Sequence, residues 1–175
     1  MFSLALSAYS GEPPERAVRE AERFVEELAV SGHRPVFFLG GYRGLMRIAA
    51  DLLLEAGFTV VFIIPVEYEG LKHPKGGIVV RTGMSFKGRN TVMVRSGDAL
   101  VALGGGAGTI MEIFAAYGEG KRVFLLTGCG LPSDRLAEAY PDGRISPETP
   151  PLLSFHEDGR SLARALTRYM DEYQA

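Results

Sequence analysis

Short apolar runs alternate with segments of helical periodicity along almost the whole of this 175-residue chain. The clearest apolar run covers residues 58–65 (FTVVFIIP) and is rich in β-branched side chains. Such a strand is usually buried on both sides, as in a parallel sheet that helices cover. Because strands that alternate with helices form βαβ units, the pattern predicts an α/β, Rossmann-like three-layer domain with a mainly parallel sheet and helices on both faces.

The same alternation divides the chain into strands and helices, and the length of the chain predicts one domain over residues 1–175. A first helix is expected to open at Pro13 and Pro14 and to end before Gly32. Two segments rich in glycine and proline, 66–83 and 127–151, are expected to be a loop with one short strand and a surface excursion; either could form a lid or a dimer contact. The expected strands are 2–8, 35–39, 58–65, 78–80, 98–103, 121–126 and 152–155, and the other helices are 45–56, 84–96, 109–117 and 159–173.

Composition excludes several classes of protein. The net charge of −2 provides no bulk basic field for nucleic acid. No apolar run is long enough for a membrane span, and residues 1–8 lack the basic start of a signal peptide, so a cytoplasmic protein is expected. The single cysteine, Cys129, excludes a disulfide within the chain; its catalytic use is the less favoured alternative, because no activating base is evident nearby. His33, His73 and His156 are scattered, so no metal site is expected.

Two glycine-rich loops follow expected strands, at the edge where such sheets bind ligands. The stronger one, residues 104–109 (GGGAGT), leads directly into an expected helix. Glycine lets an anion approach the main chain, and the start of a helix offers unpaired N–H groups and a favourable dipole. Together with the hydroxyl of Thr109, this loop is predicted to bind the phosphate of a nucleotide-like ligand. The weaker loop covers residues 40–44 (GGYRG).

A purely structural interpretation of both loops remains open. Thr109 and Glu112 have the Thr-x-x-Glu spacing of a capping box, which would explain them without any chemistry. Four glycines in five positions exceed what a capped turn needs, and this favours a ligand. In the weaker loop, Gly40 and Gly41 could simply allow a sharp turn, and Arg43 could be a solvated surface charge.

Three segments resemble, in the same order, motifs of the Lonely Guy (LOG) family of nucleotide phosphoribohydrolases, many of which were long labelled lysine decarboxylases. Residues 104–112 (GGGAGTIME) resemble PGGxGTxxE, and residues 40–46 (GGYRGLM) resemble GGGxxGLMG. Residues 89–103 (RNTVMVRSGDALVAL) resemble the segment RKxxM…SDAFIAL. The resemblance covers the chain to about residue 126.

The resemblance implies hydrolysis of the N-glycosidic bond of a nucleoside 5′-monophosphate, such as AMP or a cytokinin nucleotide, to the free base and ribose 5-phosphate. It also implies a homodimer and no cofactor. The catalytic pair falls on Arg89 and Glu112. A carboxylate can stabilise the positive charge that develops on the sugar, and a guanidinium can clamp the phosphate or base. The residues implied in phosphate and nucleotide binding are Gly40, Gly41, Gly44, Gly105, Gly106, Gly108 and Thr109.

The sequence departs from the family motifs at three positions. Gly104 replaces the motif proline, Asn90 replaces a lysine, and Met111 replaces the first of two adjacent glutamates. The last two changes thin out the polar groups around the site. They keep a second interpretation open, since the superfamily includes molybdenum cofactor carriers: a protein that binds a nucleotide or molybdenum cofactor without hydrolysing it. Lysine decarboxylation is disfavoured, because no lysine stands out as a Schiff-base residue.

Overall fold

The computed structural model describes residues 1–174, which form one seven-stranded sheet and six α-helices. The strand order is β4-β3-β2-β1-β5-β6-β7, and every adjacent pair is parallel. The strands are β1 (Ser3–Ser7), β2 (Val36–Leu39), β3 (Thr59–Ile64), β4 (Ile78–Arg81), β5 (Ala99–Ala102), β6 (Val123–Leu126) and β7 (Leu153–His156). The helices are α1 (Glu15–Val30), α2 (Gly44–Glu55), α3 (Phe86–Ser96), α4 (Ala107–Gly118), α5 (Arg135–Ala139) and α6 (Gly159–Gln174).

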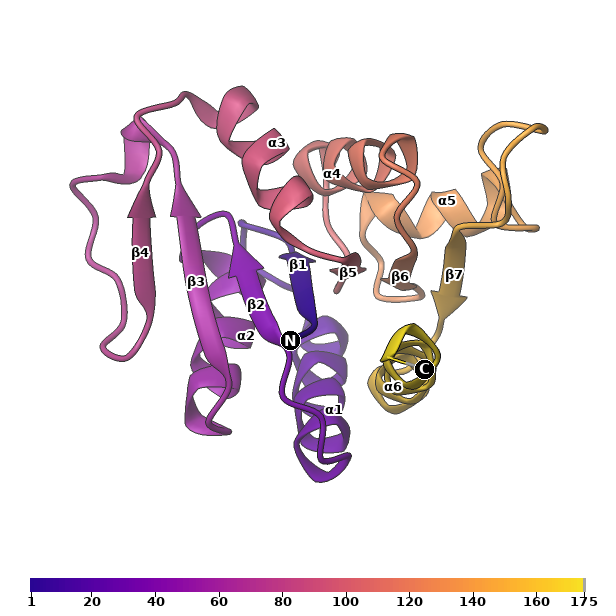
Figure 1. Cartoon of the computed structure of the whole chain (residues 1–175), viewed down its shortest axis with the longest axis horizontal. Helices are drawn as coiled ribbons and strands as arrows, with labels where there is room; N and C mark the ends of the chain where they lie inside the picture. The colour runs from indigo at the N-terminus through magenta and orange to yellow at the C-terminus, as the bar shows by residue number, and fades with distance from the viewer. Residues whose placement is uncertain (175) are drawn as a thin grey trace.

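Two hydrophobic cores make this sheet the middle of three layers. Helices α1, α2 and α6 cover one face, where Phe24, Leu53 and Leu166 pack against the sheet. Helices α3, α4 and α5 cover the other face, as Figure 1 shows. Met93 and Ile113 are buried in the core on that face. The predicted Rossmann-like α/β fold is therefore confirmed. The predicted burial of β3 holds for five of its six residues.

Several boundaries differ from those expected. The first helix begins at Glu15, because Pro14 has extended backbone (φ −58°, ψ 144°) and serves as the N-cap. Helix α3 begins at Phe86 after Ser85, another extended residue. Helix α4 begins at Ala107, two residues before the expected start. The loop predicted at 66–83 does contain one short strand, β4, and adds a 3₁₀ turn, η1 (Val66–Tyr68).

The segment 127–151 is not simply the surface excursion that its glycines and prolines predict. It contains a second 3₁₀ turn, η2 (Pro132–Asp134), which leads into α5. Cys129 and Leu131 join the core on the α1 side of the sheet, and Leu136 joins the core on the other side. The prediction was wrong for this first half, because a few apolar side chains among turn residues were enough to anchor it.

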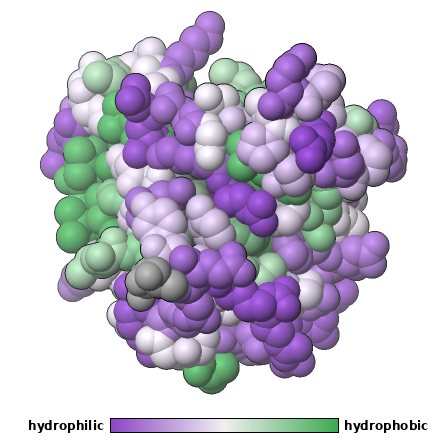
Figure 2. Space-filling view, turned by 45° about the vertical axis from the view of Figure 1, so that its right-hand side comes forward, coloured by the Kyte–Doolittle hydropathy of each residue, from purple (hydrophilic) through white to green (hydrophobic). Residues whose placement is uncertain are grey.

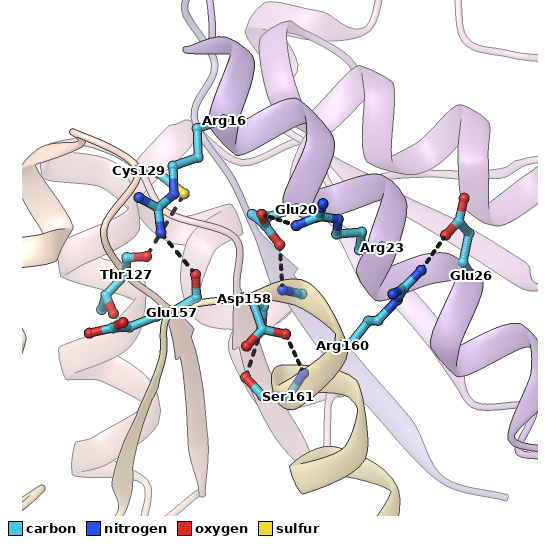
Figure 3. Close-up of polar contacts among 11 residues, drawn as sticks. Arg16, Glu20, Arg23, Glu26, Thr127, Cys129, Glu157, Asp158, Arg160 and Ser161 are labelled. Carbon is cyan, nitrogen blue, oxygen red and sulfur yellow. Dashed lines mark hydrogen bonds and ion pairs between the residues drawn. The ribbon is translucent and has the colours of Figure 1, made fainter.

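The last helix packs closely against the first, as Figure 3 shows. Glu20 of α1 is buried, and its carboxylate accepts hydrogen bonds from Arg23 (2.8 Å) and from the backbone N–H of Gly159 at the start of α6 (2.9 Å). A β-carbon on Gly159 would lie 1.9 Å from the carbonyl oxygen of Glu20. Glycine at this position therefore lets the two helices approach each other.

The surface is mostly polar on the face that Figure 2 shows. Hydrophilic residues cover most of it, while hydrophobic residues gather at its left-hand edge and in smaller areas. Among the residues described, no helix has both the length and the apolar character needed to cross a membrane.

The order of the strands decides where a ligand can enter. The chain passes outward from β1 through β2 and β3 to β4, then returns through α3 and continues on the other side of β1, at β5. The connections that leave the carboxyl ends of β1 and β5 therefore diverge toward opposite edges of the sheet. In open parallel sheets, ligands bind in the crevice at this point.

Candidate functional site

A cavity of about 390 Å³ opens at this crevice. Its lining includes the loops that follow β1, β2 and β5 and side chains of α3 and α4. Most of its lining is apolar or aromatic, with a few polar groups. The residues that line it are Ala8, Tyr9, Ser10, Gly40, Gly41, Tyr42, Arg43, Met46, Tyr68, Phe86, Lys87, Arg89, Asn90, Gly106, Ala107, Gly108, Thr109, Met111 and Glu112.

The glycine-rich loop delivers the start of α4 to this cavity. Gly106 is the N-cap, and no side chain caps the helix among the residues described. The unpaired N–H groups of the first turn therefore belong to residues that line the cavity. A β-carbon on Gly108 would meet nothing within 4 Å, so this part of the turn faces open space.

The capping-box interpretation of Thr109 and Glu112 is wrong. The helix starts at Ala107, so Thr109 lies inside its first turn rather than at the N-cap. The carboxylate of Glu112 turns toward Ser7 and Arg89 instead of the helix start. The expected boundary failed because the glycines at 106 and 108 do not reveal where the turn ends and the helix begins.

The loop after β6 holds the glycine-rich loop in place. Gly105 donates its backbone N–H to Ser133 Oγ (2.9 Å), and Ser133 donates its own N–H to the carbonyl of Gly105 (3.0 Å). Ser133 is completely buried. Gly104 has a left-handed backbone (φ +89°), and a β-carbon there would lie 2.9 Å from the Leu131 side chain. The loop is thus fixed before any ligand arrives.

Glu112 and Arg89 form a buried pair beside this loop. Arg89 Nη1 lies 3.6 Å from Glu112 Oε1, and both residues are at least 90% buried. The hydroxyl of Ser7, at the end of β1, donates a hydrogen bond to Glu112 Oε2. Burial raises the pKa of Glu112 above its ordinary value, while the Ser7 hydrogen bond and the Arg89 charge oppose that shift.

The position of Arg89 depends on two features of the fold. A β-carbon at Gly40 would lie 1.7 Å from Arg89 Nη1, so the guanidinium occupies space that only glycine leaves free. Helix α3, which carries Arg89, is held at its far end by Lys121, whose ammonium donates to the carbonyls of Val94 (2.9 Å), Arg95 (3.0 Å) and Gly97. The Nε of Arg89 is buried and has no partner among the described residues.

The structure brings most of the predicted site residues together. Two of them, Gly44 and Gly105, do not line the cavity. Gly44 has φ +53°, and a β-carbon there would lie 2.3 Å from the carbonyl oxygen of Gly11, so it serves the close approach of α2 to the loop after β1. The predicted residues that do line the cavity are Gly40, Gly41, Arg89, Gly106, Gly108, Thr109 and Glu112.

Sequence reasoning missed several residues of the site. Tyr68 and Phe86 line the cavity as an edge-to-face pair with ring centroids 4.9 Å apart. Ser7 and Ser133 hold the carboxylate and the glycine-rich loop from behind. A serine directly after three apolar residues at the end of a strand was a signal that could have identified Ser7. Nothing in the sequence distinguishes Ser133.

Neither the thiol of Cys129 nor a cluster of potential metal ligands lines this cavity within residues 1–174. Cys129 is buried, and burial raises the pKa of its thiol to about 11. No group of three or more potential metal ligands occurs among the residues described. Of the three histidines, His73 packs against Phe62 and none lines the cavity.

Comparison with protein families matches residues 9–150 to LDcluster4, the SLOG cluster4 family. The chain belongs to this SLOG family. The matched segment of this SLOG protein contains Arg89, Glu112 and every cavity residue except Ala8.

Relatives of this SLOG protein include LOG proteins. A rice (Oryza sativa subsp. japonica) protein named "Probable cytokinin riboside 5'-monophosphate phosphoribohydrolase LOGL9" is 32% identical over 172 residues, which cover 92% of this chain and 75% of the relative. An uncharacterized protein of Archaeoglobus fulgidus is 40% identical over 114 residues, 65% of this chain and 73% of that protein. The expected relationship to the LOG family is confirmed.

Solved structures confirm the fold of the SLOG protein. The crystal structure of a structural-genomics target superposes with a TM-score of 0.82 at 30% identity and covers 96% of this chain and 99% of its own. The molybdenum cofactor carrier protein of Chlamydomonas reinhardtii gives a TM-score of 0.75 at 22% identity, over 97% of this chain and 98% of its own. At that identity the likeness concerns the fold alone.

Proposed function

We propose that this SLOG protein hydrolyses the N-glycosidic bond of a nucleoside 5′-monophosphate to the base and ribose 5-phosphate. The observation that carries the proposal is the buried pair of Glu112 and Arg89 on the wall of a cavity that also contains the uncapped start of α4. A carboxylate and an uncapped helix start in the lining of one cavity suit a phosphorylated sugar. The phosphoribohydrolase names of relatives at 32% identity support the same reaction.

The phosphate binds at the first turn of α4. Backbone N–H groups of Ala107 and Gly108 and the hydroxyl of Thr109 donate to its oxygens, and the helix dipole favours its negative charge. Arg43 and Lys87, which also line the cavity, add positive charge at its mouth. With the phosphate fixed there, the ribose lies toward the carboxylate of Glu112.

The base lies against the aromatic part of the lining. Tyr9, Tyr42, Tyr68 and Phe86 provide apolar surface for a planar ring. Stacking on such side chains is tolerant of the identity of the base. The class of substrate is therefore a nucleoside 5′-monophosphate, with AMP as the first to test.

The reaction needs water and two side chains. As the bond between C1′ and the base nitrogen breaks, positive charge develops on the sugar, and the ionised Glu112 stabilises it and orients the attacking water. Water adds its oxygen to C1′, and one of its protons ends on the departing base. The Arg89 charge favours the ionised form of Glu112 and helps to hold it in place.

The test is a panel of nucleoside 5′-monophosphates incubated with purified protein, with free base and ribose 5-phosphate followed by chromatography. Glu112→Gln and Arg89→Ala are expected to lower turnover at least 100-fold, as the loss of such groups commonly does. The same two helices supply matched controls. Arg95 of α3 and Glu119, the C-cap of α4, form an exposed pair 3.8 Å apart, and Arg95→Ala and Glu119→Gln are expected to keep wild-type turnover.

The outcomes separate cleanly. Release of base by the wild type and by both control variants, and its loss in Glu112→Gln and Arg89→Ala, supports the hydrolase. No release from any nucleotide by folded wild-type protein overturns it. Equal turnover in all five proteins would show a contaminating activity and overturn the assignment of the pair.

A second candidate is a carrier that binds a phosphorylated ligand without hydrolysing it. Met111, which stands where LOG motifs have a glutamate, lines the cavity and is 52% exposed. A methionine cannot share in holding ribose hydroxyls or water. Proteins of this fold include molybdenum cofactor carriers. Saturable binding of nucleotides or of the cofactor, with no product formed, is the result expected for this alternative.

The protein is further proposed to form a homodimer, as the resemblance to LOG proteins implies. Met111 and Phe114 leave apolar surface on α4, with exposures of 52% and 40%. Light scattering after size exclusion is expected to give twice the chain mass of 19.0 kDa. A Phe114→Lys variant that dissociates would support α4 as the contact, and a wild-type monomer would exclude the dimer.

A further inference from the structure

We propose that Ser7 is a positioning residue for the hydrolysis, which holds Glu112 so that a single carboxylate oxygen, Oε1, faces the substrate. The inference rests on the proposed function and adds to it a residue outside the motifs that resemble the LOG family. Ser7 is the last residue of β1 and is 1% exposed.

The hydroxyl has one evident purpose at this position. The three preceding residues of β1, Leu4, Ala5 and Leu6, are fully buried and apolar. A polar group buried among them is unfavourable unless it is hydrogen-bonded. The only bond of the Ser7 side chain within residues 1–174 is the one it donates to Glu112 Oε2. The hydrogen bond to Glu112 therefore accounts for a serine at this core position.

Ser7 acts through Glu112 and not on the ligand. Glu112 lines the cavity, whereas Ser7 does not. Its bond engages Oε2, and Arg89 approaches the other oxygen, Oε1, at 3.6 Å. That distance is too long for a strong hydrogen bond, so Oε1 remains able to accept one from water or from the ribose. The two contacts together fix the plane of the carboxylate.

The position of Ser7 in the sheet makes this support rigid. Strand β1 is central, paired with β2 on one side and β5 on the other. The carbonyl of Ser7 accepts the N–H of Leu103 (2.9 Å), just before the glycine-rich loop. The same residue therefore ties the catalytic carboxylate and the start of the phosphate-binding loop to one strand.

The test compares Ser7→Ala with Ser3→Ala. Ser3 begins the same strand, and its hydroxyl bonds to Asp98 (2.8 Å) and the carbonyl of Ser96 (3.1 Å), away from the cavity. Ser7→Ala is expected to lower kcat for AMP at least about tenfold while KM changes by less than about threefold, because a supporting contact affects geometry more than binding. As the pH is lowered, Ser7→Ala should also lose activity at a higher pH than wild type does, because the loss of a hydrogen-bond donor raises the pKa of Glu112. Ser3→Ala should change neither.

A third variant and a second readout keep the result decisive. Ser7→Cys retains the size of the side chain but donates weakly, so it should behave as Ser7→Ala does if the hydrogen bond matters and as wild type if only packing matters. The carboxyl carbon of Glu112, followed by ¹³C NMR, should titrate at higher pH in Ser7→Ala than in wild type or Ser3→Ala. This NMR titration does not require turnover. If the wild type hydrolyses no nucleotide, the proposed function is overturned, while the titration still tests the contact between Ser7 and Glu112. An unchanged titration and unchanged kcat would overturn the role of Ser7.

Discussion

The guanidinium of Arg89 occupies the place where a β-carbon at residue 40 would be, with Nη1 only 1.7 Å from that position. Gly40 follows β2 and Arg89 lies on α3, so the contact joins the loop at the end of a strand to a helix that covers one face of the sheet. It explains a glycine in the weaker of the two loops without any appeal to backbone freedom. The side chain that pairs with Glu112 needs that space.

Gly40→Ala is therefore expected to displace the guanidinium and to lower turnover at least about tenfold, because misplaced catalytic groups are costly. Overpacking of this kind also destabilises a protein by about 1–3 kcal/mol. Gly118→Ala is the matched control: Gly118 lies in the last turn of α4, and a β-carbon there meets nothing within 4 Å. Kinetics and urea unfolding of both variants check the expectation, and equal behaviour would contradict it.

Activity should depend on the ionisation of Glu112. Burial raises its pKa above the ordinary value of 4.5, so the carboxylate becomes protonated at a higher pH than an exposed glutamate would. We expect kcat/KM to fall as the pH is lowered through that raised pKa. A profile measured from pH 4.5 to 9 checks this. An acid limb at or below the ordinary value would show that Glu112 is not the group that must be ionised.

The raised pKa of Glu112 also affects stability, in the opposite direction to its effect on activity. The folded protein binds the Glu112 proton more tightly than the unfolded chain does, because the folded pKa is raised. Its contribution to the free energy of unfolding is therefore largest at low pH and declines as the pH rises from 4.5 through the folded pKa. The difference between wild type and Glu112→Gln in urea unfolding should shrink or turn negative over that range. A difference that grows with pH would be inconsistent with the shift.

Ser133 should matter although it touches no ligand. Ser133→Ala leaves the buried N–H of Gly105 without its acceptor, which costs about 1–3 kcal/mol. Because that bond fixes the glycine-rich loop, affinity for AMP should fall as well. Thr167→Ala removes an exposed hydroxyl bond on α6 and is expected to stay within about 0.5 kcal/mol. Urea unfolding and calorimetric titration measure both effects, and a neutral Ser133→Ala would refute the role of the clamp.

Cys129 is expected to be chemically inert in the folded protein. Its thiol is buried, with a pKa raised to about 11, so little thiolate is present near neutral pH. A thiol reagent should label it far more slowly in native protein than in urea. Cys129→Ala should retain turnover within about twofold, as for a residue outside the site. Rapid native labelling together with loss of turnover would restore the thiol as a candidate.

The sequence predicted the fold well because its signal was repeated. Each apolar run and each helical segment supported the same alternation, so errors of one or two residues at Glu15 or Phe86 did not change the architecture. The resemblance to LOG motifs named Arg89 and Glu112, and the structure brings the two side chains together.

What could not be predicted depends on the order of the strands. Ser7 meets Glu112 only because β1 lies beside β5, and an alternating pattern of strands and helices does not specify which strands are neighbours. Ser133 lies in a segment whose glycines and prolines predict exposure, and Leu131 and Leu136 beside it proved sufficient to bury it. The start of α4 was misplaced because glycines at the helix start carry no periodicity.

The hydrogen bond between Ser7 and Glu112 spans 105 residues of chain. It requires β5 and the helix that follows it to lie against β1, so it closes a long segment of chain that contains β2 to β4. A partly folded chain would therefore contain the glycine-rich loop but no oriented carboxylate. Substrate turnover should consequently return late in refolding, after most helical structure. Its recovery would then report when the two halves of the sheet pair through β1 and β5.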